Sequence, residues 1–393
     1  LFTHGTEQLL TGSSWVTQKL ENTSLQRYLA WMFMAALATG AAMLWGQVPG
    51  TGMRTLLPLS LPAVVIWALL LASCLWLVLR HHDRFLSVIV ASAVGLVTSL
   101  SFVSFSAPDL ALTQLTVDVV ATVLLLMGLA LLPRQSPHES SIPRKLRDGT
   151  LALAIGASMA WLAWVMLTRD HESISWYFLN HAAVAGGGTN AVNVILVDFR
   201  GYDTFGEITV LGIAAIGVLA LMDGMHTRRP AMDAAGLAWT FASQPLLLRV
   251  AARVLLPIAL VVTLYIFMRG HNQPGGGFIA GLITAVSLVM QYMANGQSHA
   301  EALLRADGGR RFVRWIGLGL GIAGLTGVGA FFFGQPFLTS AHGNPDLPFL
   351  GSLPLATAAL FDLGVYITVV GATLLTSSTL RTVTRVPTDK LPS

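Results

Sequence analysis

The sequence predicts an all-α, polytopic integral membrane protein with about ten transmembrane helices and both termini in the cytoplasm. Of its 393 residues, 54% are hydrophobic and only 11% are charged, and the mean hydropathy is +0.68. Soluble domains carry about 25% charged residues. The apolar residues gather in long runs, and the basic residues lie in the short segments between them. This distribution explains the pI near 9.5 better than nucleic-acid binding does.

Ten apolar runs are long enough to cross a membrane, because a helix needs roughly 20 such residues to span a hydrocarbon core about 30 Å thick. The sixth run is short and holds Glu207 near its start. The seventh holds Arg253 near its beginning, where a long side chain can reach the interface. The ten runs are 25–46, 59–80, 84–105, 109–133, 149–168, 204–222, 250–268, 275–294, 315–334 and 354–379.

The basic residues predict the orientation of these runs. With ten spans, 19 of the 23 Lys and Arg residues fall in the N-terminal segment, in alternate loops and in the C-terminal segment. Only Arg54, Arg169, Arg200 and Arg269 fall on the opposite side. Cytoplasmic loops carry the excess of Lys and Arg, so both termini are expected in the cytoplasm.

Two polar segments divide the chain into modules. The first is 134–149, and the second is 222–249, which contains a predicted interfacial stretch at 231–242.

Leu1 is not an initiator Met and no signal peptide follows it, so we expect that further sequence precedes the chain. The single cysteine, Cys74, lies in an apolar run, which excludes a disulfide framework and a Cys-based metal site.

Asp118 is the acidic residue that lies deepest in any run. It follows Asp109 by nine residues, or about 13 Å along a helix, which places it near the middle of the membrane. An acid there costs roughly 2.5 to 3.5 kcal/mol on insertion scales, so it should face protein or water. Gln114 lies one turn earlier on the same polar stripe, and the preceding run offers Ser and Thr as a facing wall. A proton relay is favoured over the alternative, a neutral Asp that only joins two helices.

A second polar cluster follows the fifth run, in the stretch NAVNVILVDFRGYDTFGEI at 190–208. It places Asp198 and Asp203, together with Asn190 and Asn193, at the outer mouth of the sixth run, with Glu207 about one turn inside. Such oxygen ligands suit hard cations, and an ion vestibule is one interpretation. The other is a solvated loop in which Asp203 begins the helix and Glu207 is stabilised by the helix dipole.

Three further features have mainly structural interpretations. Asp362 lies about two turns inside the tenth run and could pair with Tyr366 one turn on. The loop 269–278 contains three consecutive glycines, which favours a tight turn over an anion site. Gly317, Gly321 and Gly324 are spaced to let the ninth run pack closely on a neighbour.

The chain has no Lys or Arg deep within any run, and its only lysines are at 19, 145 and 390. Relays of buried Lys and Glu use Lys because burial shifts its pKa readily. The buried Lys residues of such a relay are absent from this sequence. We therefore expect the chain to act as a non-enzymatic subunit and not to transport alone.

The motifs in these stretches resemble the Mrp-type multisubunit cation/proton antiporter, also called Mnh, Pha or Sha. SFSAPDLALTQLTVDVVATVLLL resembles its MbhD-like module, and GTNAVNVILVDFRGYDTFGEITVLGIAAIGVLALM resembles its MbhE-like module. RVLLPIALVVTLYIFMRGHNQPGGGFIAGL, FLTSAHGNPDLP and ALFDLGVYITVVGATLL resemble its MnhB-type subunit. The chain therefore resembles the C-terminal part of the MnhA-type subunit fused to the MnhB-type subunit.

The resemblance implies five segments. They are an N-terminal segment with the first helix (1–58), the MbhD-like module (59–135), the MbhE-like module (148–224), a linker (225–248) and the MnhB-like module (249–381). The segment 1–58 would be the tail of an antiporter-like region upstream. The family pattern usually has Glu where this chain has Asp118.

The resemblance also implies a function, exchange of Na⁺ (or Li⁺ or K⁺) for protons, driven by the proton-motive force across the bacterial inner membrane. The implied partners are the antiporter-like part of the MnhA-type subunit, subunits of types C to G, and lipid, with no organic cofactor or metal. Asp118, Glu207 and Gln114 would serve as relay positions and Asp198 and Asp203 as outer-mouth ion positions, with Asp109 and Asp362 as further candidates. The alternatives are a membrane-arm subunit of an energy-converting hydrogenase or other complex I relative, and a structural scaffold.

Overall fold

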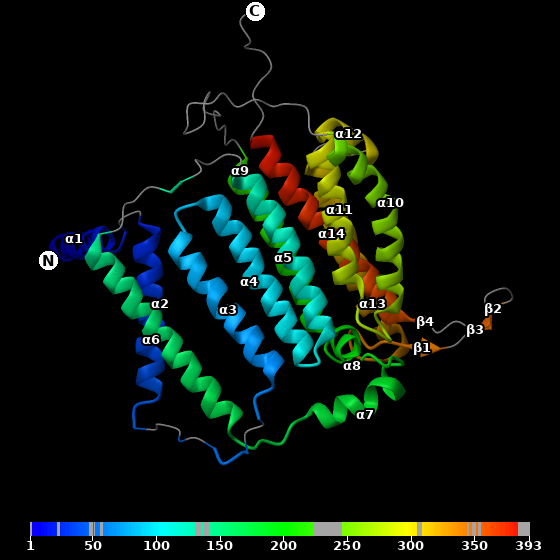
Figure 1. Ribbon diagram of the computed structural model, residues 1–393, viewed down its shortest axis with the longest axis horizontal. Helices are drawn as coiled ribbons and strands as arrows, with labels where there is room; N and C mark the ends of the chain where they lie inside the picture. The colour runs from blue at the N-terminus through cyan, green and yellow to red at the C-terminus, as the bar shows by residue number, and fades with distance from the viewer. Residues whose placement is uncertain are drawn as a thin grey trace, which may run out of the picture. The chain divides into compact units, whose positions relative to one another are not determined.

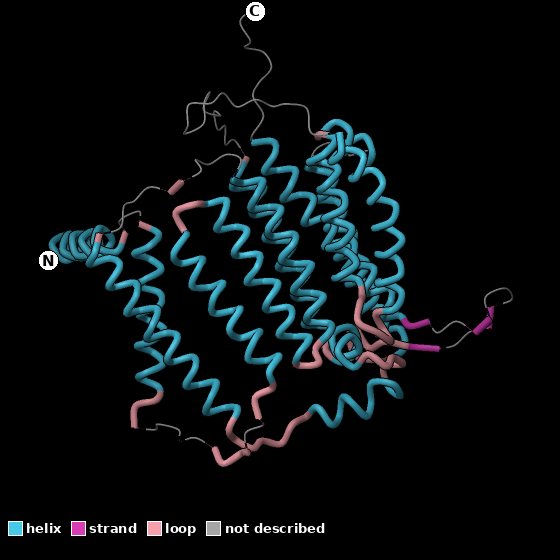
Figure 2. The backbone as a smooth tube through the Cα atoms, in the orientation of Figure 1, coloured by secondary structure: helices cyan, strands magenta, loops and turns pink. Residues whose placement is uncertain are grey.

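The structure, a computed structural model, describes most of the chain as helices (Figures 1 and 2). Two compact units emerge, Leu1–Pro58 with His138–Ser173, and Leu59–Pro137 with Ile174–Ser393. The described residues are all except 1, 22–23, 47–49, 51, 56–57, 130–134, 137–140, 224–245, 305–308, 344–345, 348–350, 353–354 and 384–393. The predicted interfacial stretch at 231–242 and nearly all of the predicted linker lie outside them.

The described residues of the first unit form three helices. They are α1 (Phe2–Leu20), α2 (Leu25–Met43) and α6 (Ile142–Leu167), and α2 packs against α6. The chain after α2 is joined to the end of α6, because the Arg54 amide donates to the Thr168 carbonyl at 3.0 Å and the Gly52 amide donates to the Thr168 hydroxyl at 3.0 Å.

The second unit contains the other elements. Its helices are α3 (Leu61–Arg80), α4 (Arg84–Ser104), α5 (Pro108–Leu129), α7 (Ser175–Ala185), α8 (Ala191–Val194), α9 (Gly201–Met222), α10 (Leu246–Arg269), α11 (Gly277–Asn295), α12 (Gln297–Leu304), α13 (Gly309–Gly329) and α14 (Thr357–Val383). A π-helical turn, η1 (Ile195–Phe199), precedes α9, and a 3₁₀ turn, η2 (Ala330–Phe333), follows α13. Four two-residue strands pair antiparallel: β1 (His342–Gly343) with β4 (Leu355–Ala356), and β2 (Asp346–Leu347) with β3 (Gly351–Ser352).

Nine helices among the described residues are long and apolar enough to cross a membrane: α3, α4, α5, α6, α9, α10, α11, α13 and α14. They coincide with nine of the ten expected runs, which confirms the predicted fold class. The first expected run, 25–46, forms α2 but is not among the nine, since its first turn holds Gln26 and Arg27. The polar segment 134–149 is also not a simple linker, because α6 begins at Ile142, with Pro143 in its first turn.

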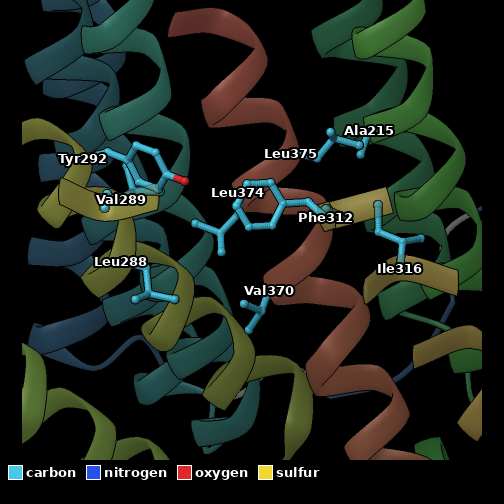
Figure 3. Close-up of a cluster of buried hydrophobic side chains, with 11 residues drawn as sticks. Ala215, Leu288, Val289, Tyr292, Phe312, Ile316, Val370, Leu374 and Leu375 are labelled. Atoms are coloured by element: carbon cyan, nitrogen blue, oxygen red, sulfur yellow. The ribbon is translucent and has the colours of Figure 1, made fainter. Parts of the chain in front are cut away.

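Helix α14 lies at the centre of the second unit. It packs against α9, α11 and α13, and 72% of its membrane-length window is buried. The core around it combines side chains from α9, α11, α12, α13 and α14, among them Ala215 (α9), Leu288 (α11), Phe312 (α13) and Leu374 (α14) (Figure 3). Burial of such side chains stabilises the bundle, and it fixes the positions of the polar groups around α14.

Glycine allows α13 and α14 to approach closely, but not at the predicted positions. A Cβ at Gly319 would lie 2.6 Å from the Gly364 carbonyl and would overlap the Thr368 hydroxyl. A Cβ at Gly317 or Gly321 would meet nothing within 4 Å. Within this chain the expected stripe is therefore wrong at Gly317 and Gly321. Gly324 faces Phe205 of α9, which a Cβ would meet at 3.7 Å, and Gly319 lies on the face that meets α14.

Alternate loops of the second unit meet at one end of its bundle. The Asn190 amide donates to the His271 carbonyl at 3.1 Å, and the Ser340 amide donates to the Asp198 carboxylate at 3.3 Å. At the end of α4 and α5 that lies away from these loops, Asp83 pairs with Gln135 in an isolated bridge. Successive loops therefore lie at opposite ends of the bundle, in agreement with the predicted alternation of loops between the two sides of the membrane.

Candidate functional site

Asp118 lies on α5 with its carboxylate against α4. The Ser92 hydroxyl of α4 donates to the Asp118 Oδ2 atom at 2.8 Å. A Cβ at Gly95, also on α4, would overlap the Asp118 carboxylate. The Asp118 side chain is half-buried. It lies against the α4 backbone at Gly95, where the absence of a side chain leaves room for the carboxylate. The predicted wall of small hydroxyl residues is present, with Ser92 as its member in contact.

Gln114 and Asp109 precede Asp118 on the same helix. Gln114 is half-buried one turn earlier, and Asp109 lies in the first turn of α5. At about 1.5 Å per residue, Asp109 and Asp118 are about 13 Å apart along the helix axis. The three side chains thus extend from the end of the bundle toward its middle.

Asp109 is joined to Asn190, which lies before α8. The Asn190 side-chain amide donates to the Asp109 Oδ1 atom at 3.1 Å, to the Gly270 carbonyl at 3.2 Å and to the Gln273 carbonyl at 3.1 Å. The side-chain oxygen of Asn190 accepts from the Asn193 amide at 3.4 Å and caps α8. Asn190 was expected beside Asp198 in an ion vestibule, whereas its amide group is directed toward Asp109.

The glycine loop before α11 is held by two carboxylates. The Gly275 amide donates to Asp109 Oδ1 at 3.3 Å, and the Gly277 amide donates to Asp362 Oδ2 at 2.6 Å. Between them, Gly276 has φ +102°, a conformation that favours glycine. The tight turn favoured from the sequence is therefore present, and the anions at its amides are the protein's own side chains.

Asp362 does not pair with Tyr366 as was expected. It is buried, and its carboxylate accepts from Gly277 of α11. The Tyr366 hydroxyl instead lies 3.0 Å from the Thr284 hydroxyl of α11. Asp362 and Tyr366 therefore form two successive polar contacts between α14 and α11.

Asp198 lies in the π-helical turn η1. Its Oδ1 atom accepts from the Ser340 amide, and its Oδ2 atom faces Gly186, where a Cβ would lie 3.2 Å away. The Thr204 hydroxyl donates to the Leu196 carbonyl at 2.7 Å within this irregular turn. Turns of this kind occur often at functional sites. Nothing in the residue pattern had indicated one.

Asp203 and Glu207 lie on the outside of α9. Asp203 forms an exposed ion pair with Arg200 at 2.6 Å. Glu207 is exposed one turn further along the helix, beside Val210. Asp198, Asp203 and Glu207 are thus not gathered in one cluster. Asp198 faces the loop at Ser340, whereas Asp203 and Glu207 are exposed on the surface of α9.

The described carboxylates are spread along the bundle and are not gathered into one pocket. Within the part of the chain that the structure describes, no group of three or more His, Cys, Asp or Glu could hold a metal ion. What the arrangement provides is a series of protonatable groups, with Asp118 inside the span and Asp109 and Asp362 on either side of the glycine loop. The bridging role of Asn190 was missed in the sequence, because its partners lie 80 to 83 positions away.

The fold and these residues together define a multi-pass helical membrane protein that holds carboxylates inside its helix bundle, a feature typical of proteins that move protons or ions. Three family models match it: the "Domain related to MnhB subunit of Na+/H+ antiporter" at 247–375, MbhE of MBH at 143–240 and MbhD of MBH at 69–134. The chain belongs to the family of Mrp-type, or Mnh-type, Na⁺/H⁺ antiporter subunits.

Individual relatives agree with this assignment. The chain is 39% identical over 396 residues to a probable K(+)/H(+) antiporter A/B subunit of Rhizobium meliloti (strain 1021), covering 92% of this chain and 38% of that protein. It is 46% identical over 129 residues to the Na(+)/H(+) antiporter B-type subunit of Bacillus subtilis (strain 168), covering 33% of this chain and 87% of that protein.

A solved structure is similar over almost the whole chain. A chain in the Mrp complex from Dietzia sp. DQ12-45-1b matches with a TM-score of 0.81 and 30% identity, covering 96% of this chain and 41% of that chain. The sequence thus spans about two fifths of the length of the A/B relative and of the solved chain.

Proposed function

We propose that the chain is a membrane subunit of a multisubunit antiporter that exchanges a monovalent cation, Na⁺, for protons under the proton-motive force. Within it, Asp118, Gln114 and Glu207 serve as proton or ion relay positions, and Asp109 and Asp362 are further candidates. Asp198 and Asp203 serve as ion positions at the outer mouth. The membrane is the bacterial inner membrane, and the exchange uses no organic cofactor.

The observation that carries the proposal is the setting of Asp118. Its carboxylate lies in the interior of a membrane-length helix, accepts from the Ser92 hydroxyl and remains half-buried. A charge in such a position is costly and is kept where it serves a path or a pair. Among the described residues, no Lys or Arg forms an ion pair with it. A group that can release and regain a proton fits this setting.

The partners follow from the same reasoning. The sequence has no Lys or Arg deep in a span, so the buried cations of a complete relay would come from outside these 393 residues. We propose the antiporter-like part of the MnhA-type subunit and subunits of types C to G as those partners. The match to an MnhB-type domain at 247–375 favours this assembly over the membrane arm of an energy-converting hydrogenase.

The test is exchange measured as Na⁺-dependent change of ΔpH in everted vesicles that contain the whole complex. Asp118→Asn keeps the shape of the side chain but cannot ionise, so exchange should collapse to background. Asp118→Glu retains a carboxyl group and should retain a measurable part of the exchange. Assembly is checked by native gel in each case. Wild-type exchange in Asp118→Asn would leave the residue as a hydrogen-bonding group in a scaffold.

A further inference from the structure

A pocket lies in the first unit, where the two packed helices α2 and α6 begin. It has a volume of about 460 Å³. It is separate from the candidate ion path, because the carboxylates of that path all lie in the second unit. We name it the arginine pocket, and its lining residues are Ser24, Gln26, Arg27, Pro143, Arg144 and Arg147.

The two helices run in the same direction away from the arginine pocket. Helix α2 begins at Leu25 and α6 at Ile142, both beside the pocket. At their other ends, the chain after α2 is joined to α6 by the bonds of Gly52 and Arg54 to Thr168. The N-terminus of a helix carries a partial positive charge, and neither first turn here holds an acidic residue. Arginines at such an end are electrostatically unfavourable, and a bound anion would relieve the repulsion.

The charge of the arginine pocket is only partly balanced by the protein. Arg147 pairs with Asp148 at 2.7 Å, and Asp148 does not line the pocket. Among the residues that the structure describes, no carboxylate pairs with Arg27 or Arg144. The guanidinium group of Arg presents a planar fork of donors that matches the oxygens of a phosphate. Two arginines from two helices therefore offer such donors to one anion.

The residues around the arginine pocket place it at the boundary of the membrane. Arg147 lies two positions before the apolar run 149–168, in the membrane-length helix α6. On α2, Tyr28 and Trp31 follow Arg27 and are exposed, and aromatic side chains of this kind gather at membrane interfaces. The excess of basic residues predicts that this side is cytoplasmic. Basic pockets between membrane helices on that side bind phospholipid headgroups.

We propose that the arginine pocket binds the headgroup phosphate of an anionic phospholipid such as phosphatidylglycerol. Arg27 and Arg144 contact the phosphate, one from each helix. The exposed apolar surface of α2 and α6 beyond the pocket, which includes Leu29 and Leu153, is suited to the acyl chains. Phosphatidylcholine is disfavoured, because the arginines repel its cationic choline group. A soluble phosphate ester shares the anionic chemistry, but the position of the pocket at the start of two apolar helices favours a ligand with acyl chains.

The test is photolabelling of the assembled complex in phosphatidylcholine vesicles that contain a small share of photoactivatable phosphatidylglycerol. After illumination and digestion, mass spectrometry measures the labelling of peptides from the starts of α2 and α6. We expect labelling there that an excess of unlabelled phosphatidylglycerol abolishes and that soluble glycerol phosphate leaves unchanged. The readout is lipid binding, so its result is independent of whether the complex exchanges Na⁺ for protons.

Three results would overturn the proposal. Equal labelling by a photoactivatable phosphatidylcholine would mean that the pocket does not select an anionic headgroup. Competition by glycerol phosphate as effective as that by phosphatidylglycerol would identify a site for a soluble phosphate ester. An absence of labelling at both helix starts in the assembled complex would mean that another subunit, and not lipid, covers the pocket.

The variant that isolates the pocket is Arg144→Gln. Labelling should fall at least about fivefold, since each basic residue near an anionic lipid contributes measurably to its binding. Lys145→Gln is the matched control, because it removes the same charge at the next position, from an exposed side chain that does not line the pocket. Equal losses in the two variants would show that general surface charge, and not the pocket, attracts the lipid.

A second variant covers the case in which Arg144→Gln does not accumulate. Arg27→Gln changes an exposed side chain on the other helix, so the chain should fold and assemble as before. Its labelling should also fall at least about fivefold relative to Lys145→Gln. Full labelling in Arg27→Gln would contradict a site shared by the two helices.

Discussion

Gly95 is the position at which the surroundings of Asp118 can be altered while the carboxylate itself is kept. A Cβ there would overlap the Asp118 carboxyl group, so Gly95→Ala must displace it from α4 and from Ser92. We expect exchange to fall at least about tenfold, because an ångström-scale misplacement of a reacting group is costly. Gly128→Ala on α5 is the control, since a Cβ there meets nothing within 4 Å. Equal exchange in the two variants would mean that the contact with α4 is not needed for transport.

Glu207 provides a second residue-scale prediction. It is exposed on α9 between Asp203 and Val210, and hydrocarbon cannot solvate a carboxylate there. It therefore needs water or a polar partner beyond this chain. Glu207→Gln should strongly reduce exchange in everted vesicles while the complex still assembles on a native gel.

Asp203→Asn is the comparison for Glu207→Gln, because Asp203 lies one turn away in an exposed ion pair with Arg200. Such pairs contribute about 0–1 kcal/mol, so assembly should be unchanged. The apparent KM for the external ion should rise, and more so at low salt, where surface charge is screened least. If Glu207→Gln keeps wild-type kinetics, the residue serves only as an acid near a helix start.

At the scale of elements, the contact between α13 and α14 depends on one glycine face. Gly319→Ala would place a methyl group against the Gly364 carbonyl and Thr368, which should destabilise the bundle by about 1–3 kcal/mol. Gly321→Ala, two residues away on the same helix, meets open space and should be neutral or slightly stabilising. The measurement is the temperature at which half of the purified complex is lost, and equal values for the two variants would contradict the assigned face.

The same helix shows where sequence reasoning reaches its limit. Length and hydropathy predict the spans well, because a span must be apolar over roughly 20 residues whatever surrounds it. Helix α13 has six glycines between 317 and 329, so overlapping spacings fit more than one face. Only the position of α14 in the structure shows that the helix face with Gly319 is the one in contact.

For the whole molecule, the prediction concerns which loops share a side of the membrane. Single cysteines at His342 and His81, each in a Cys74→Ala background, should react with an impermeant thiol reagent from opposite faces of the membrane. Both positions are exposed and lie in the second unit. The excess of basic residues predicts that the His81 side is cytoplasmic. Labelling of both from one face would contradict the alternation of spans.

The site was only partly predictable at this scale. Asp118 could be assigned to the protein interior from its depth alone, and Ser92 confirms that it faces a neighbouring helix. The partners of Asp109 and Asp362 could not, since both contact a glycine loop more than 80 residues away. Contacts between distant loops depend on how the spans are ordered in space, which local patterns do not contain.

The π-helical turn at Ile195–Phe199 leads to an expectation about relatives that have one residue fewer at this point of the sequence. A π-helical turn holds one residue more than an α-helical turn, and is therefore equivalent to a single inserted residue. Removing one residue between 195 and 199 would rotate the preceding segment by about 100° relative to α9. Asp198 and Asn190 could then no longer keep both of their present partners. A relative that lacks one residue at this point should therefore have substitutions at both positions, a pattern that can be sought in sequences alone.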